Sequence, residues 1–92
     1  MSDITVFQMP LFKRSYKKLK RNQQEATDQA ITRIIETPTL GEQKKGDLNG
    51  VYVYKFDCVN QQFLLAYEWE PTTRILLALG VHENFYRDLK RV

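Results

Sequence analysis

The sequence predicts a single α+β domain in which a helical hairpin packs on one face of a small antiparallel sheet. Three observations lead to this prediction: helical spacing of apolar residues in the first third of the chain, alternating spacing after Gly50, and short turns between the later strands. The predicted order is strand, helix, helix, strand, strand, strand, helix. With 92 residues, of which 42% are hydrophobic, residues 1–92 are expected to form one domain with its own core.

The first part of the chain predicts a strand and two helices. Residues 4–8 alternate weakly, as in a short strand. Pro10 suits the first turn of a helix, where its missing N–H costs no hydrogen bond. A turn is expected at 21–24, with Asn22 capping a second helix that Pro38 ends. Apolar residues with helical spacing form one stripe on each helix: Phe12, Tyr16 and Leu19 on the first, and Ala26, Ala30, Ile31, Ile34 and Ile35 on the second.

The second part predicts a long loop and three strands. Residues 37–50 are polar and hold three of the four glycines, which indicates a loop. Alternation then predicts strands over 51–57 and 63–70, and the apolar run 75–79 predicts a central strand buried on both faces. Residues 83–91 are expected to form a final short helix.

The predicted strands divide the sheet into two unlike faces. The helices should cover an apolar and aromatic face, formed by Tyr52, Tyr54, Phe56, Phe63, Leu65, Tyr67 and Trp69. The other face is expected to carry Lys55, Glu68 and Glu70 and to be only partly covered.

Positive charge is concentrated near the N-terminus. The net charge is +3, yet residues 10–21 alone contain six basic residues and no acid, so the rest of the chain is net acidic. The basic residues of this segment are Lys13, Arg14, Lys17, Lys18, Lys20 and Arg21. Such a block attracts polyanions, and the attraction weakens as salt rises. The alternative is a solvated helix face that binds nothing.

Several classes of protein are excluded. Cys58 and His82 are the only cysteine and histidine, so neither an internal disulfide nor a structural zinc site is expected. The N-terminus lacks the basic flank of a secretory signal, and no apolar run is long enough to span a bilayer. We therefore expect a cytoplasmic protein without metal or cofactor. No phosphate-binding glycine loop, nucleophile elbow or dinucleotide fingerprint is present.

Residues 80–87 hold the groups best suited to chemistry. His82 and Tyr86 are four residues apart, so one helical turn places them on the same side, and Arg87 follows. An imidazole, a phenol and a guanidinium could move protons and clamp a phosphate. The alternatives are a surface imidazole, a phenol packed in the core, and a cation favoured by the end of a helix.

Three lysines could complete such a site. Lys55 points to the open sheet face, and the loop that carries Lys44 and Lys45 could fold over it. Together with the C-terminal groups they cover three needs of RNA cleavage by its own 2′-OH: removal of the 2′ proton, stabilisation of the phosphorane charge, and protonation of the leaving 5′ oxygen. Alternatively, Lys55 forms a cross-strand pair with Glu68.

These features together resemble the RelE/ParE superfamily of type II toxin–antitoxin toxins. The resemblance covers nearly the whole chain. It rests on the basic helical hairpin, a Lys-x-x-Leu-x-Gly step at Lys45, Leu48 and Gly50, the segments VYVYKF and LLAYEW, and the C-terminal LGVHENFYRDLKR. In the last segment, Gly80, His82, Tyr86 and Arg87 match a pattern of glycine, histidine or arginine, tyrosine and a basic residue.

The resemblance implies an activity and the residues that perform it. Ribonuclease members enter the ribosomal A site, cut mRNA without a metal ion, and inhibit translation. Lys55 matches a strand lysine of these members, His82 the basic residue after the last strand, and Tyr86 a catalytic tyrosine. Two positions depart from the pattern: Val53 and Leu64 stand where a lysine and an arginine often occur. His82 would then do more of the proton transfer, helped by Glu83 or Glu68.

The resemblance also implies partners and leaves alternatives. The partners are a cognate antitoxin, the ribosome and mRNA, with no membrane; the toxin–antitoxin complex would bind operator DNA through the antitoxin. The basic residues of segment 10–21, with Lys44 and Lys45, would contact RNA or the ribosome. One alternative is a ParE-like DNA gyrase inhibitor without catalytic residues, and another is a non-enzymatic nucleic-acid-binding module. The pair His82 and Tyr86 favours the endoribonuclease.

Overall fold

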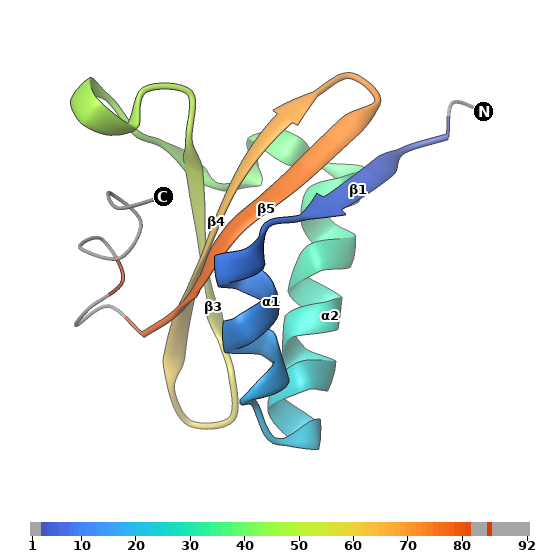
Figure 1. Ribbon diagram of the computed structural model, residues 1–92, viewed down its shortest axis with the longest axis vertical. Helices are drawn as coiled ribbons and strands as arrows, with labels where there is room; N and C mark the ends of the chain where they lie inside the picture. The colour runs from blue at the N-terminus through green and yellow to red at the C-terminus, as the bar shows by residue number, and fades with distance from the viewer. Residues whose placement is uncertain (1–2, 82–84, 86–92) are drawn as a thin grey trace.

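The computed structural model describes residues 3–81 and residue 85, and its fold is the predicted α+β architecture (Figure 1). Helices α1 (Pro10–Lys17) and α2 (Arg21–Glu36) lie on one face of a five-stranded sheet. The strands are β1 (Thr5–Gln8), β2 (Glu42–Gln43), β3 (Tyr52–Asp57), β4 (Gln62–Glu70) and β5 (Thr73–Gly80). Their order across the sheet is β1-β5-β4-β3-β2. The helix predicted over 83–91 lies outside the described residues.

The two helices form the predicted hairpin, but the second begins earlier than expected. Helix α1 starts at Pro10, and α2 starts at Arg21. The expected cap at Asn22 is wrong, because the side chain of Gln23 reaches back and its Oε1 accepts a 2.9 Å hydrogen bond from the Lys20 N–H. The Tyr16 hydroxyl donates to Asp28 Oδ1 at 2.8 Å, which ties the two helices together.

The sheet is mixed because its first strand joins it in parallel. Strands β3, β4 and β5 are antiparallel neighbours, as predicted. Strand β1 pairs in parallel with β5, with Thr5 opposite Thr73. The loop 37–50 contains two 3₁₀ turns, η1 (Pro38–Leu40) and η2 (Gly46–Leu48), and the short strand β2, which pairs with the start of β3. This strand was not predicted.

Each face of the sheet buries its own cluster of apolar side chains. The helix-covered face contains Phe12, Ile34, Leu65 and Tyr67, as the alternation predicts, with Tyr52, Tyr54, Phe56 and Trp69 partly buried around them. The opposite face is more apolar and better covered than expected. Its buried cluster is Val51, Val53, Leu64, Ala66, Leu77, Ala78 and Phe85. Lys55 and Glu70 on β3 and β4 are exposed, whereas Glu68 is half-buried.

Candidate functional site

The basic segment keeps all of its charges at the surface. Phe12 is 1% exposed, and Tyr16 and Leu19 pack partly against the same cluster, so the predicted apolar stripe faces the sheet. All six basic residues of segment 10–21 are exposed. Within the described part of the chain, the only ion pair that involves them joins Arg21 Nε to Glu25 Oε1 at 3.7 Å. Helix α1 and the start of α2 therefore present a continuous stretch of positive charge.

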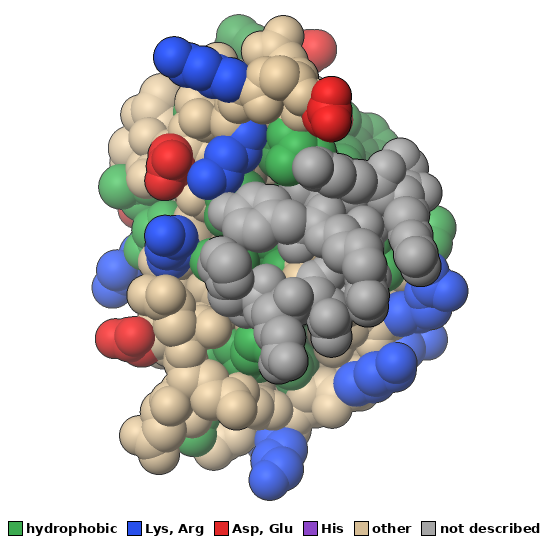
Figure 2. Space-filling view, turned by 90° about the vertical axis from the view of Figure 1, so that its left-hand side faces the viewer, with side chains coloured by type: hydrophobic (Ala, Val, Ile, Leu, Met, Phe, Trp, Pro, Cys, Tyr) green, Lys and Arg blue, Asp and Glu red, His purple; other side chains and the backbone are tan. Residues whose placement is uncertain are grey.

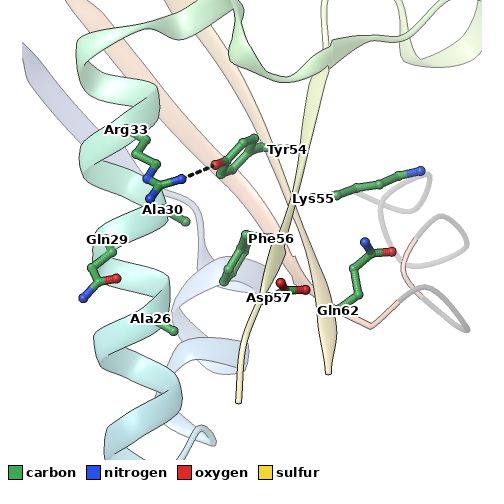
Figure 3. A pocket seen from close by; sticks show the side chains of 9 residues that line it. All are labelled: Ala26, Gln29, Ala30, Arg33, Tyr54, Lys55, Phe56, Asp57 and Gln62. Carbon is green, nitrogen blue, oxygen red and sulfur yellow. Dashed lines mark hydrogen bonds between the residues drawn. The ribbon is translucent and has the colours of Figure 1, made fainter. Parts of the chain in front are cut away.

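The three predicted lysines have different surroundings. Lys55 is exposed on β3, and its side chain points away from α2 (Figure 3). Lys44 is only partly exposed, and its Nζ lies 3.4 Å from Glu42 Oε1. Lys45 is exposed beside η2. In the strand register Lys55 lies opposite Leu64, so the alternative of a direct cross-strand pair with Glu68 does not hold.

The strand positions that depart from the ribonuclease pattern are buried. Val53 is 2% exposed and Leu64 is 1% exposed, both within the apolar cluster of the second face. A cation at either position would lose its hydration in this cluster, so neither position suits the charged residue of the ribonuclease pattern. Of the β3 and β4 residues on this face, Lys55 is the one that supplies a positive charge.

The predicted catalytic residues His82, Glu83, Tyr86 and Arg87 lie outside the described residues. Strand β5 ends at Gly80, and Val81 is 41% exposed. Phe85 is 4% exposed and belongs to the buried cluster of the second face. A hollow of about 200 Å³ adjoins these residues; it is lined by Leu11, Ser15, Ala78, Leu79, Gly80, Val81 and Phe85.

Figure 2 shows the side of the molecule that faces away from α2. Lys and Arg side chains lie at separate places around its margin, and acidic side chains lie between some of them. The cations on the described part of this side are therefore scattered. The basic residues of segment 10–21, in contrast, form a concentrated block of positive charge.

Arg74 and Tyr67 hold the frame of the site together through hydrogen bonds to main-chain groups. The sequence predicted no role for Arg74, and for Tyr67 it predicted only a position on the apolar face. Arg74 is 3% exposed, and its guanidinium donates to the carbonyls of Ile34 (3.1 Å) and Ile35 (2.8 Å) at the end of α2. It also donates to the carbonyls of Glu70 and Thr73, at 2.7 and 2.9 Å. An arginine directly before the apolar run 75–79 is the sequence signal that could have indicated such a buried role.

Tyr67 fixes the loop that precedes β2. Its hydroxyl donates to the Pro38 carbonyl at 2.7 Å and accepts from the Gly41 N–H at 2.9 Å. A Cβ at position 41 would lie 2.7 Å from the same hydroxyl, so the close approach requires glycine. Burial raises the pKa of the Tyr67 phenol, and the hydrogen bond from Gly41 opposes the rise.

A groove lies between α2 and the outer edge of β3 (Figure 3). Its volume is about 430 Å³. It is lined by Ala26, Gln29, Ala30 and Arg33 of α2, by Tyr54, Lys55, Phe56 and Asp57 of β3, and by Gln62 of β4. One Arg33 guanidinium nitrogen, Nη1, lies 3.4 Å from the Tyr54 hydroxyl across it.

Residues 3–81 and 85 contain no cluster of three or more histidine, cysteine, aspartate or glutamate side chains that could hold a metal ion. No helix among them is long and apolar enough to cross a membrane.

A family model described as the ParE-like toxin of type II bacterial toxin–antitoxin systems matches residues 6–90. The chain belongs to this toxin family. A search of curated protein sequences found no match. The family assignment therefore rests on this model, and the solved structures add the fold.

Structures of RelE toxins share the fold of this ParE-like toxin. The intact E. coli RelBE toxin–antitoxin complex matches with a TM-score of 0.69 and 15% identity, covering 87% of this chain and 98% of that one. A mutant of E. coli RelE in the free state matches with a TM-score of 0.73 and 13% identity, covering 97% and 92%. The RelBE2 complex of Mycobacterium tuberculosis matches with a TM-score of 0.73 and 19% identity, covering 87% and 99%. This ParE-like toxin thus has a RelE-like fold.

Proposed function

We propose that the chain cleaves mRNA on the ribosome and thereby inhibits translation. The observation that carries the proposal is a RelE-like toxin fold whose N-terminal helix presents the exposed cations of residues 10–21. Charge of this kind binds an RNA backbone through release of counterions. Residues 13–21, with Lys44 and Lys45, would contact ribosomal RNA or the message.

The proposed chemistry is attack of the 2′-OH on the adjacent phosphate. His82, assisted by Glu83 or Glu68, would take up the 2′ proton, while Tyr86 would protonate the leaving 5′ oxygen. Lys55 and Arg87 would stabilise the charge that develops on the phosphorane. The burial of Val53 and Leu64 supports this division of roles, because those two strand positions hold no cation. The reaction needs no metal ion.

The proposal includes a partner that silences the toxin. The family is defined by toxin–antitoxin systems, and two of the similar structures are complexes of a toxin with its antitoxin. We expect a cognate antitoxin to bind this chain in the cytoplasm, and the resulting complex to bind operator DNA through the antitoxin.

The site is tested by two substitutions in an mRNA cleavage assay with translating ribosomes. His82→Ala and Tyr86→Phe should each slow cleavage at least about tenfold, which is the scale for loss of an acid–base group. Glu36→Gln at the exposed end of α2 serves as the control and should cleave at the rate of the unmodified protein. Full cleavage by both site variants would show that the assigned residues are wrong.

A second candidate function is inhibition of DNA gyrase. It is favoured by the matching family description, ParE-like toxin, and by the apolar second face of the sheet, where catalytic cations of the ribonuclease pattern are missing at Val53 and Leu64. A gyrase inhibitor needs no catalytic side chains. In purified gyrase with supercoiled plasmid it would block supercoiling or trap cleaved DNA, whereas a ribonuclease would leave the gyrase reaction unchanged.

A further inference from the structure

The turn between β3 and β4 holds a valine in a backbone conformation that suits glycine or asparagine. The Cys58 N–H donates to the Gln61 carbonyl at 2.6 Å, and Val59 and Asn60 lie between them. Both have a positive φ, 51° and 67°, which is the sign pattern of a type I′ hairpin turn. Asparagine adopts this region readily, whereas a β-branched side chain is strained there. Val59 therefore lowers the stability of the turn.

The described structure gives no packing reason for a valine at this position. Val59 is 43% exposed, and it is not among the side chains that pack against the two buried clusters of residues 3–81 and 85. The residues that follow it, Asn60, Gln61 and Gln62, are exposed as well. An apolar side chain that is held at the surface in a strained turn, without a contact to the core, indicates a role in recognition.

The hairpin is fixed to the start of helix α2. Cys58 is 0% exposed, and its Sγ donates to the Gln23 carbonyl at 3.5 Å. The same carbonyl accepts from Thr27 Oγ1 at 2.9 Å, and the Gln23 side chain accepts from the Lys20 N–H at 2.9 Å. Figure 1 shows the β3–β4 hairpin and the turn between the helices at the same, lower end of the molecule. The valine thus has a fixed place beside the basic segment.

The hairpin tip, residues 59–62, is neutral, whereas the neighbouring turn between the helices is strongly basic. The exposed cations nearest that turn in sequence are Lys17, Lys18, Lys20 and Arg21. The nearest acid in the hairpin, Asp57, precedes the tip. Phosphates attracted by the helix turn therefore meet no negative charge on the tip.

These groups fit the unpaired nucleotides of an RNA better than its backbone. Phosphate contacts position a protein on a nucleic acid, and contacts to the bases add selectivity. Unpaired nucleotides expose base faces, riboses and base edges. A valine packs against a base face or a ribose, and the amides of asparagine and glutamine form hydrogen bonds with base edges. The basic segment supplies the first kind of contact, and the hairpin tip supplies the second.

We propose that the hairpin tip contacts unpaired nucleotides of ribosomal RNA beside the place where the basic segment binds the backbone. Val59 packs against a base or a ribose, and the amides of Asn60 and Gln61 bind base edges. The proposal rests on the ribosomal activity proposed above and adds a recognition element to the charge of the basic segment.

The first test compares stability with affinity for purified ribosomes. Val59→Asn fits the turn, so it should raise the melting temperature by about 4 °C or more. It should also weaken ribosome binding about tenfold, the loss expected when one valine side chain is no longer buried in a contact. A purely structural residue would not combine a gain in stability with a loss of binding. Unchanged affinity, or a melting temperature that does not rise, would overturn the proposal.

A matched control lies at the other end of α2. Leu40 in η1 is 47% exposed, so Leu40→Asn makes the same kind of change at a similar exposure. It should bind ribosomes within about twofold of the unmodified toxin, since the apolar contact assigned to the tip is absent there. Equal losses for Leu40→Asn and Val59→Asn would show that the tip has no special role.

The salt dependence separates base contacts from phosphate contacts. Val59→Asn should leave the slope of log affinity against log salt unchanged, whereas Lys18→Glu should reduce it by about one unit. Asn60→Gly keeps a residue that tolerates positive φ and removes the amide, so it should weaken binding at least about fivefold with the same slope. A reduced slope for Val59→Asn would contradict the assignment of the tip to bases.

Chemical probing of ribosomal RNA at saturating toxin identifies the partner. Unpaired nucleotides that the unmodified toxin protects should become reactive again with Val59→Asn and with Asn60→Gly. A loss of affinity with an unchanged RNA footprint would assign the tip to a ribosomal protein and overturn the proposed RNA contact.

The outcomes separate this inference from the proposed activity. Binding and probing use ribosomes without message, so cleavage does not enter the measurement. A toxin that binds ribosomes equally well with and without Val59 would contradict only the role of the tip. A toxin that does not bind ribosomes at all would contradict the proposed activity, and this inference with it.

Discussion

Arg74 joins the end of helix α2 to strand β5 through hydrogen bonds to main-chain carbonyls. Arg74 is buried, and its Cζ lies 5.9 Å from the centroid of the Trp69 ring. A buried cation without a carboxylate partner among the described residues is tolerated because carbonyl oxygens replace the lost water. Arg74 thus sets where α2 ends relative to the sheet, and with it one wall of the groove.

Replacing Arg74 should destabilise the fold strongly. Arg74→Met keeps much of the volume but leaves the carbonyls of Ile34 and Ile35 without donors, which should lower the free energy of unfolding by about 3 kcal/mol. Arg33→Met, at an exposed position of α2, should change it by less than about 0.5 kcal/mol. Urea unfolding of both variants measures the difference, and equal midpoints would show that the Arg74 hydrogen bonds contribute little.

Tyr67 should make stability depend on alkaline pH. Burial raises the pKa of its phenol, so the folded protein keeps the proton at a pH where the unfolded chain, with a phenol pKa near 10, has lost it. The stabilisation is complete below about pH 10 and declines as pH rises from there toward the folded pKa.

Tyr67→Phe isolates this effect. Loss of both hydrogen bonds should cost about 1–3 kcal/mol at neutral pH. Because phenylalanine does not ionise, the stability gap between the two proteins should narrow above about pH 10. Denaturant unfolding at a series of pH values measures the gap, and a gap that stays constant up to pH about 11.5 would contradict the argument.

Periodicity in the sequence predicted most of the helices and strands, and local hydrogen bonding decided the rest. The alternation of residues 51–70 and the stripe containing Phe12 predicted β3, β4 and the helix-covered face. Strand β2 has two residues, too few to show a period, and it forms because Tyr67 positions the chain beside β3. The start of α2 is capped by the side chain of Gln23, which accepts a hydrogen bond from the Lys20 N–H. The residue types around Asn22 do not by themselves show which side chain makes this bond.

The same limit applies to the candidate site. The exposure of the basic segment followed from the position of its apolar stripe, so that surface was predictable from the sequence. The burial of Val53 and Leu64 depends on how the second face packs, which includes Phe85 and the bulged pairing near Ala66 and Tyr67. The groove beside α2 combines residues from three elements, and no spacing in the sequence brings them together.

The exposed lysines of helix α1 should contribute to ribosome binding. Lys17→Glu and Lys18→Glu should each weaken ribosome binding and reduce the slope of log affinity against log salt by about one unit. Both residues are exposed, so stability should change by less than about 0.5 kcal/mol. Arg33→Glu has the same charge change outside the basic segment and should leave the slope unaltered. Identical slopes for all three would assign the basic segment to a solvated surface.

The whole molecule separates its working surfaces by face. The helices cover one side of the sheet and carry the basic segment, the second face packs an apolar cluster around Phe85, and the outer edge of β3 lies between α2 and that face (Figure 1).

The most direct measurement is to incubate the purified toxin with an mRNA, with and without translating ribosomes, and to map the 3′ ends produced. If the chain is a ribosome-dependent endoribonuclease, cuts appear at defined positions within codons when ribosomes are present, and the message stays intact when they are absent. Intact message in the presence of translating ribosomes, with translation unimpaired, would contradict it.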